Sequence, residues 1–124
     1  MDQKIKSFTG LIAWKEGHKL VLMIYEIADL FPKKEIFGLA SQMQRAAVSI
    51  TSNIAEGFSR QTDKDKSHFY TMALGSITEL QNEILVARDL KYITNEKFLA
   101  IAHHTIKVHK LTNGLIKYLR NRNT

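Results

Sequence analysis

The sequence of 124 residues contains no cysteine, a single proline and no long uncharged apolar run. Without cysteine, neither a disulfide nor a metal site with thiolate ligands can form. No segment reaches the roughly 18 uncharged apolar residues that suggest a membrane-spanning helix. The N-terminal segment MDQKIKSF also lacks the apolar run of a signal peptide. We therefore expect a cytoplasmic protein that has no membrane role.

Residues that interrupt helices are also scarce, since only six glycines accompany the one proline. Hydrophobic residues make up 44% of the chain and charged residues 24%, a balance that argues against disorder. A chain of this length buries roughly two-thirds of its extended surface when it folds. The composition indicates one compact, mostly helical domain over residues 1–124.

Apolar residues recur at the helical period in four segments separated by short polar connections. Pro32 disfavours helical geometry at the preceding residue and ends the first segment. The four predicted helices span about residues 11–30, 35–58, 63–90 and 95–119. Long helices joined by short loops pack as antiparallel neighbours, so we predict an all-α fold, an antiparallel up-down-up-down four-helix bundle.

Two threonines stand where helix N-caps are expected. Thr62 is followed three residues later by Asp65, which resembles a capping box, and Thr94 precedes the fourth helical pattern. Both patterns predict that the threonine hydroxyl closes the first turn of a helix.

Helical periodicity also assigns the residues that face the core. The expected inward positions include Ile36 and Gly57 in the second helix, Phe69 in the third, and Ala102 and Leu115 in the fourth.

Acidic residues are missing after Glu96, and this absence creates the whole net charge of +6. Residues 1–96 hold twelve Lys plus Arg and twelve Asp plus Glu, whereas residues 97–124 hold six cations and no acid. The fourth helix places four of these cations away from its apolar side: Lys107, Lys110, Lys117 and Arg120. One interpretation is a ridge that contacts nucleic-acid phosphates. The other is a helix face whose charges only maintain solubility.

The stretch SITSNIAEGFSR, residues 49–60, is rich in residues that disfavour a helix interior. On a helix its polar members align with an upstream arginine in one stripe, formed by Arg45, Ser49, Ser52, Asn53, Glu56 and Arg60. The stripe is either a solvated face or a polar packing seam. We favour the seam, because small side chains next to the expected i,i+4 ion pair of Glu56 and Arg60 allow another backbone to approach closely. Arg45, Ser49, Asn53, Glu56 and Arg60 are therefore candidate residues of an oligomer interface.

A second stripe on the first helix contains aromatic residues beside the main apolar side. Trp14 and Tyr25 belong to it, together with His18 and Leu22. Either these large side chains fill the edge of the bundle, or they contact another subunit, since Tyr and Trp suit interfaces.

Motifs of known catalytic and metal sites are missing. The five histidines include no pair at i,i+4 spacing and no HExxH motif, and no glutamate starts a Glu-x-x-His pair of the di-iron type. There is no glycine-rich phosphate loop and no nucleophile elbow. We therefore expect no enzymatic activity, no metal site and no cofactor.

Two runs, FPKKEIFGLASQMQRAAVSITSNIAEGFSR and HFYTMALGSITELQNEILVA, resemble the four-helix-bundle proteins encoded in intervening sequences of bacterial 23S ribosomal RNA genes. The positions that match the family pattern are Trp14, Phe31, Pro32, Glu35, Leu39, Gln42, Arg45, Ser49, Asn53, Ile54, Ala55, Glu56, Gly57, Arg60, Gly75, Ser76, Glu79 and Leu80. The chain departs from it at Thr51, where many relatives carry proline, and at Gln81, where an acid is common.

The resemblance has implications of its own. It implies a homopentamer of bundles around a central axis and no established enzymatic activity. The same fold family includes the accessory protein of diversity-generating retroelements, and relatives in that branch bind nucleic acid and a reverse transcriptase. Our leading hypothesis is an oligomeric accessory protein that binds RNA or DNA through helix four. The alternative is a protein-interaction scaffold without a nucleic-acid role.

Overall fold

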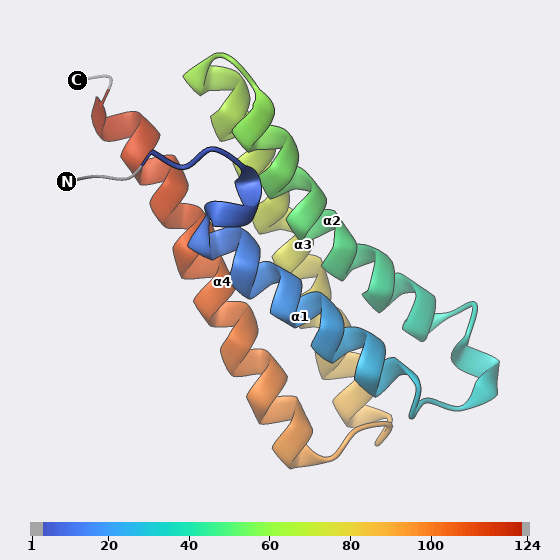
Figure 1. Cartoon of the computed structure of the whole chain (residues 1–124). Coiled ribbons are helices and arrows are strands. Elements are labelled where there is room, and N and C mark those ends of the chain that lie inside the picture. The colour runs from blue at the N-terminus through green and yellow to red at the C-terminus, as the bar shows by residue number, and fades with distance from the viewer. Residues whose placement is uncertain (1–3, 123–124) are drawn as a thin grey trace.

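The computed structural model describes residues 4–122 and consists of four long helices. The elements, in chain order, are η1 (Phe8–Gly10), α1 (Ile12–Ala28), η2 (Lys33–Glu35), α2 (Leu39–Ser59), α3 (Asp63–Asp89) and α4 (Asn95–Arg122). Figure 1 shows the chain reversing its direction from each long helix to the next. Each helix contacts two others, because α1 packs against α2 and α4 while α3 packs against the same two. The predicted all-α four-helix bundle is confirmed.

The core lies along the length of the bundle and receives side chains from all four helices. Its fully buried members include Leu20, Ile24, Met43, Ile50, Ile54, Ile77, Leu80, Ile84 and Val108. Most are branched aliphatic residues, which have few rotamers to lose and pack in defined positions. Two threonines of α4, Thr105 and Thr112, are also fully buried, and each hydroxyl donates to a backbone carbonyl of the preceding turn. These local hydrogen bonds explain how polar groups are accommodated in the core.

The predicted N-caps are confirmed at two helices. The Thr62 hydroxyl accepts a hydrogen bond from the backbone N–H of Asp65 at 3.1 Å. The Thr94 hydroxyl accepts one from the backbone N–H of Lys97 at 3.2 Å. Each bond satisfies one of the N–H groups that the first turn of a helix leaves without an intrahelical partner.

Helix α2 begins at Leu39 rather than near Glu35, so the predicted start is wrong. The segment before it forms the single turn η2 followed by a bend at Gly38. The Glu35 carboxylate accepts hydrogen bonds from the Leu39 N–H at 3.0 Å and from the Tyr92 hydroxyl at 2.8 Å. Glu35 therefore acts as a side-chain cap for α2 instead of forming its first turn, and these bonds lower its pKa, the Leu39 bond contributing most.

Two inward assignments, Ile36 and Phe69, are wrong. Ile36 lies in the connection before α2 and is exposed, as is Phe37 beside it. On α3, Phe69 is only partly buried, because the next residue, Tyr70, points into the bundle. On α4, the predicted inward residues Ala102 and Leu115 are partly buried and pack against the core. The predicted inward position of Gly57 is confirmed.

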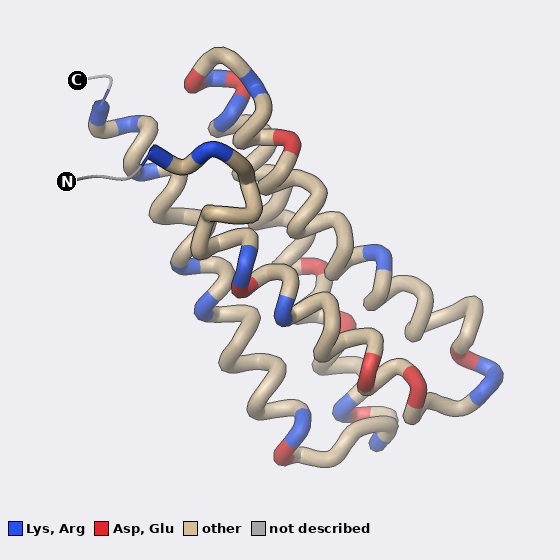
Figure 2. The backbone as a smooth tube through the Cα atoms, in the orientation of Figure 1, with Lys and Arg blue, Asp and Glu red and all other residues tan. Residues whose placement is uncertain are grey.

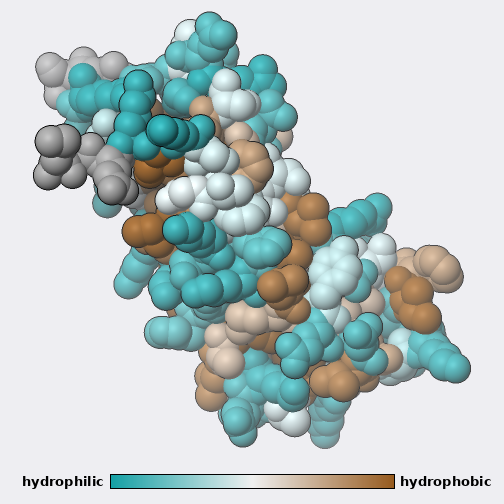
Figure 3. Space-filling view, in the orientation of Figure 1, coloured by the Kyte–Doolittle hydropathy of each residue, from teal (hydrophilic) through white to brown (hydrophobic). Residues whose placement is uncertain are grey.

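The end of the molecule that carries the α1–α2 connection exposes apolar surface. Phe37 is 97% exposed and Ile36 is 54% exposed. Figure 3 shows apolar residues gathered at this end, which is formed by the connection drawn between α1 and α2 in Figure 1. None of the helices within residues 4–122 has the length and apolar character needed to cross a membrane.

Candidate functional site: a polar seam and a basic helix

The contact between α2 and α3 contains a polar seam. The hydroxyls of Ser49 on α2 and Ser76 on α3 are hydrogen-bonded at 2.8 Å. The side-chain amide of Asn53 donates to the backbone carbonyl of Ser49 at 2.9 Å and to its hydroxyl at 3.1 Å. Ser49 and Asn53 are thus partly buried in a contact within one chain. The small side chains allow the two helices to approach closely.

The remaining predicted interface residues of α2 are exposed. Glu56 and Arg60 form an ion pair at 3.0 Å, and roughly half of each side chain is open to solvent. The Arg60 guanidinium also lies 4.5 Å from the centre of the Phe69 ring. Arg45 is exposed one turn before Ser49. These three side chains leave a charged surface on α2 that other molecules can reach.

A buried carboxyl lies at the Arg45 end of the seam. Glu83 on α3 is 6% exposed, and one of its carboxyl oxygens has no hydrogen-bond partner among the described residues. Burial is the main reason that the pKa of Glu83 rises to about 7, with smaller contributions from the neighbouring Glu79 carboxyl. The charge of Arg45 opposes this rise without cancelling it. The burial of Glu83 was not predicted from the sequence, although its spacing of seven residues after Ser76 places both on one side of α3.

The two aromatic candidates of α1 are in different environments. Trp14 is half-buried, stacks on His18 with ring centres 4.8 Å apart, and meets the edge of Phe8 at 5.4 Å. It therefore fills the edge of the bundle where η1 folds over α1. Tyr25 is 45% exposed, so its ring offers surface to another molecule.

The cations of α4 are mostly free of partners. Lys110, Lys117 and Arg120 are exposed and make no ion pair with any of the residues 4–122. Figure 2 shows basic residues recurring along α4 and an acidic residue only at its beginning, which is Glu96 in the sequence. Unpaired cations on one helix maintain a positive field that attracts anions.

Lys107 differs from the other three cations because it faces α1. Its ammonium lies 3.3 Å from the carboxylate of Glu16, which also accepts a hydrogen bond from Lys19 at 3.1 Å. The imidazole Nε2 of His104 completes the cluster, 2.9 Å from the backbone carbonyl of Glu16 and 3.4 Å from its carboxylate. The hydrogen bond from Lys19, followed by the contributions of Lys107, holds the pKa of Glu16 below its usual value despite burial. This cluster joins α1 to α4.

Sequence analysis could detect only part of the Glu16 cluster. The i,i+3 spacing of Glu16 and Lys19 is visible in the sequence, but His104 lies 88 residues away and meets Glu16 only in the folded bundle. Across residues 4–122, no three His, Asp or Glu side chains gather as a metal site would require.

Comparisons with known proteins agree with this architecture. A crystal structure of a protein with unknown function from the S23 ribosomal protein family of Bacteroides thetaiotaomicron superposes with a TM-score of 0.79 at 21% sequence identity. The match covers 86% of this chain and 99% of that protein, and at this identity it supports the fold alone. No curated protein matches the chain. The family model described as 23S rRNA-intervening sequence protein matches residues 9–114, which is most of the chain. The protein is therefore a member of the 23S rRNA-intervening sequence protein family.

Proposed function

We propose that the protein is a non-enzymatic accessory protein that binds RNA or DNA through the basic face of α4. The observation that carries this proposal is the set of exposed cations Lys110, Lys117 and Arg120, which have no ion pair among the described residues, on a helix without an acid after Glu96. Cations of one sign on a rigid helix can contact successive phosphates and release their counterions. The surface lacks any base-reading motif, so contacts go to the backbone and to the shape of the nucleic acid.

Lys107 makes a smaller contribution to this face than its neighbours. Its pairing with Glu16 neutralises part of its charge and holds its side chain toward α1. A phosphate would have to compete with that carboxylate. The proposed contact surface therefore centres on Lys110, Lys117 and Arg120.

We also propose that the protein assembles into an oligomer, which the family resemblance suggests is a pentamer. The exposed side chains Tyr25, Arg45, Glu56 and Arg60 are available for contacts between chains. Assembly would present several α4 faces together, so weak phosphate contacts would reinforce one another. The relation to the accessory protein of diversity-generating retroelements stays a prediction.

The proposal is tested with a triple variant of α4 and a control of equal charge. Lys110→Gln, Lys117→Gln and Arg120→Gln lower the net charge by three without touching a buried residue. The control, Lys15→Gln, Lys33→Gln and Lys34→Gln, removes three exposed cations elsewhere. Titration of a structured RNA at fixed low salt should show binding at least tenfold weaker for the α4 variant than for the control. Equal affinities of the two variants would mean that α4 is not the binding face.

A protein-interaction scaffold is the second candidate, and exposed apolar surface favours it. Phe37 and Ile36 are exposed in the α1–α2 connection, close in sequence to the exposed Lys33 and Lys34. Large exposed apolar side chains commonly mark protein contacts. If the parent protein binds neither RNA nor DNA at low salt, the scaffold function replaces our first proposal.

A further inference from the structure

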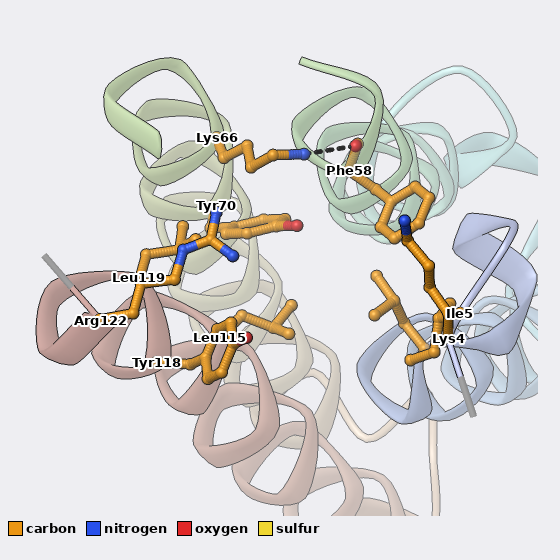
Figure 4. Close-up of a pocket in the computed structure, with 10 residues that line it drawn as sticks. Lys4, Ile5, Phe58, Lys66, Tyr70, Leu115, Tyr118, Leu119 and Arg122 are labelled. Carbon is orange, nitrogen blue, oxygen red and sulfur yellow. Dashed lines mark hydrogen bonds between the residues drawn. The ribbon is translucent and has the colours of Figure 1, made fainter. Parts of the chain in front are cut away.

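One end of the bundle contains a pocket that none of the preceding functions uses. Its volume is about 450 Å³, within the range of roughly 300–1,000 Å³ typical of small-molecule sites. The pocket lies where the segment before η1, the end of α2, the first turns of α3 and the last turns of α4 come together (Figure 4). These four segments thus build one concave site from residues far apart in the sequence.

Much of the pocket lining is apolar. Ile5, Leu11, Phe58, Leu115 and Leu119 line the pocket, and all five are aliphatic or aromatic. Leu11 and Leu119 belong to the buried core, so the apolar lining continues into the interior of the bundle. This lining favours a ligand with an apolar body, because transfer of that body from water is favourable.

Other lining residues carry hydrogen-bond donors and positive charge. Lys4 and Lys66 line the pocket, no acidic residue does, and neither lysine makes an ion pair with a described residue. The Lys66 ammonium donates one hydrogen bond, to the carbonyl of Phe58 at 2.7 Å, and so has two donors left. Arg122 also lines the pocket, but an ion pair with Asp63 neutralises its charge. The charge available to a ligand therefore comes from the two lysines.

Tyr70 adds an unused donor at the centre of the pocket. Its side chain is only 3% exposed, and its hydroxyl makes no hydrogen bond with any of the residues 4–122. Figure 4 shows the ring reaching from α3 toward the middle of the pocket, with Lys66 and Arg122 around it. Burial raises the pKa of Tyr70, so the hydroxyl keeps its proton at neutral pH. The hydroxyl opens onto the pocket (Figure 4), so a ligand oxygen that lies there can accept a hydrogen bond from it.

We propose that this pocket binds a small organic monocarboxylate, with the carboxylate at Tyr70, Lys4 and Lys66 and the apolar body against Phe58, Leu115 and Leu119. A carboxylate offers two oxygens that accept hydrogen bonds and a charge that complements the two lysines. The apolar lining residues select against short, fully hydrated anions such as acetate. The site is separate from the exposed cations Lys110 and Lys117 of α4, which do not line the pocket.

The test uses octanoate as the probe and two control compounds. 1-Octanol keeps the apolar chain but lacks the carboxylate, and acetate keeps the carboxylate but lacks the long chain. Calorimetric titration of the full chain should show saturable binding of one octanoate per chain, at least tenfold tighter than 1-octanol, and no binding of acetate. Tyr70→Phe keeps the ring and removes only the hydroxyl, so it should weaken octanoate binding about tenfold. Lys4→Gln lies on an exposed segment and should weaken octanoate binding without affecting the fold. Lys110→Gln, on the far face of α4, is the control and should leave octanoate binding unchanged.

Three results would each overturn the proposal. Octanoate that fails to saturate shows that there is no site. Equal binding of octanoate and 1-octanol shows that the lysines and Tyr70 do not recognise the carboxylate. Unchanged octanoate binding in both Tyr70→Phe and Lys4→Gln places any site elsewhere. Circular dichroism of each variant checks that its helices are intact.

Discussion

Among single residues, Glu83 combines deep burial with a neighbouring carboxyl, and its pKa of about 7 lies above its usual value of 4.5. The folded protein therefore holds a proton at Glu83 that the unfolded chain has already lost between these two pH values. Stability from this group is fully present below about pH 4.5 and falls as the pH rises to 7. Above pH 7 the buried carboxylate is charged and destabilises the bundle.

Glu83→Gln should remove this dependence on pH, because an amide has nearly the same shape and does not titrate. We expect the variant to be more stable than the parent at pH 8, by of the order of 1–3 kcal/mol, and to lose this advantage at pH 5. Urea unfolding at the two pH values measures both effects. Parallel pH profiles for parent and variant would show that Glu83 is not the titrating group.

Gly57 and Gly75 have opposite surroundings, although both lie inside helices. A Cβ atom at Gly57 would lie 2.7 Å from the ring of the buried Tyr70 and 3.2 Å from the carbonyl oxygen of Lys66. A Cβ atom at Gly75 would meet nothing within 4 Å. The missing side chain at Gly57 thus permits the close approach of α2 and α3, whereas no neighbour among residues 4–122 requires a glycine at position 75.

The same substitution at these two glycines should have opposite effects. Gly57→Ala should destabilise the protein by about 1–3 kcal/mol through overpacking. Gly75→Ala should stabilise the isolated chain by about 0.5–1 kcal/mol, because alanine favours the helix. Urea midpoints of both variants provide the comparison. A stabilising Gly57→Ala would mean that Tyr70 moves aside easily and that the contact is loose.

At the level of elements, local signals were readable from the sequence and long-range partners were not. Thr62 and Thr94 were predicted as caps because each cap and its N–H partner lie three residues apart. The start of α2 was missed because Glu35 is held partly by Tyr92, which lies 57 residues away. The prediction from helical periodicity alone therefore placed residues 35–38 in the second helix, whereas in the structure they precede α2.

The candidate site was predictable to a similar extent. The polar stripe of α2 was visible as an alignment, but its division into inner and outer parts depends on Ser76 of α3, the partner of Ser49. The excess of cations in α4 was visible as well, but the pairing of Lys107 with Glu16 exists only once α1 and α4 are packed. Charge and periodicity are properties of one segment, whereas these pairings are properties of the packed helices.

The end of α3 provides a prediction about one element. Lys91 follows the helix with φ of 64°, and the N–H groups of Lys91 and Tyr92 donate to the carbonyls of Arg88 and Ala87. This is the Schellman arrangement, in which the left-handed position is usually glycine. Lys91→Gly should stabilise the protein by about 1 kcal/mol by removing the Cβ clash. Lys91→Ala is the matched control, because it removes the charge but keeps the Cβ atom, and it should bring no such gain in thermal unfolding.

At the scale of the whole molecule, the proposed assembly depends on the exposed part of α2. Glu56→Lys breaks the ion pair with Arg60 and places like charges together. In a monomer this exposed pair contributes only a few tenths of a kcal/mol. In an assembly that buries the pair, the unpaired charge costs several times more.

Sedimentation of the parent should therefore give a mass about five times the 14.2 kDa of the chain, and Glu56→Lys should dissociate it. The helical signal in circular dichroism should stay nearly unchanged in the variant. Ser59→Lys adds one cation at an exposed position of the last turn of α2 and keeps the Glu56–Arg60 pair, so it is the control for an added cation without loss of the pair. A parent that sediments as a single chain at every concentration excludes the oligomer, and an assembled Glu56→Lys places the interface elsewhere.

The most direct measurement of the central claim is the dependence of RNA affinity on salt. If α4 contacts phosphates through Lys110, Lys117 and Arg120, each contact releases counterions, and the logarithm of affinity falls linearly with the logarithm of salt concentration. We predict a slope of about −2 or steeper for the parent, and steeper still if several α4 faces bind one RNA. A slope near zero would contradict the claim that α4 binds the nucleic-acid backbone.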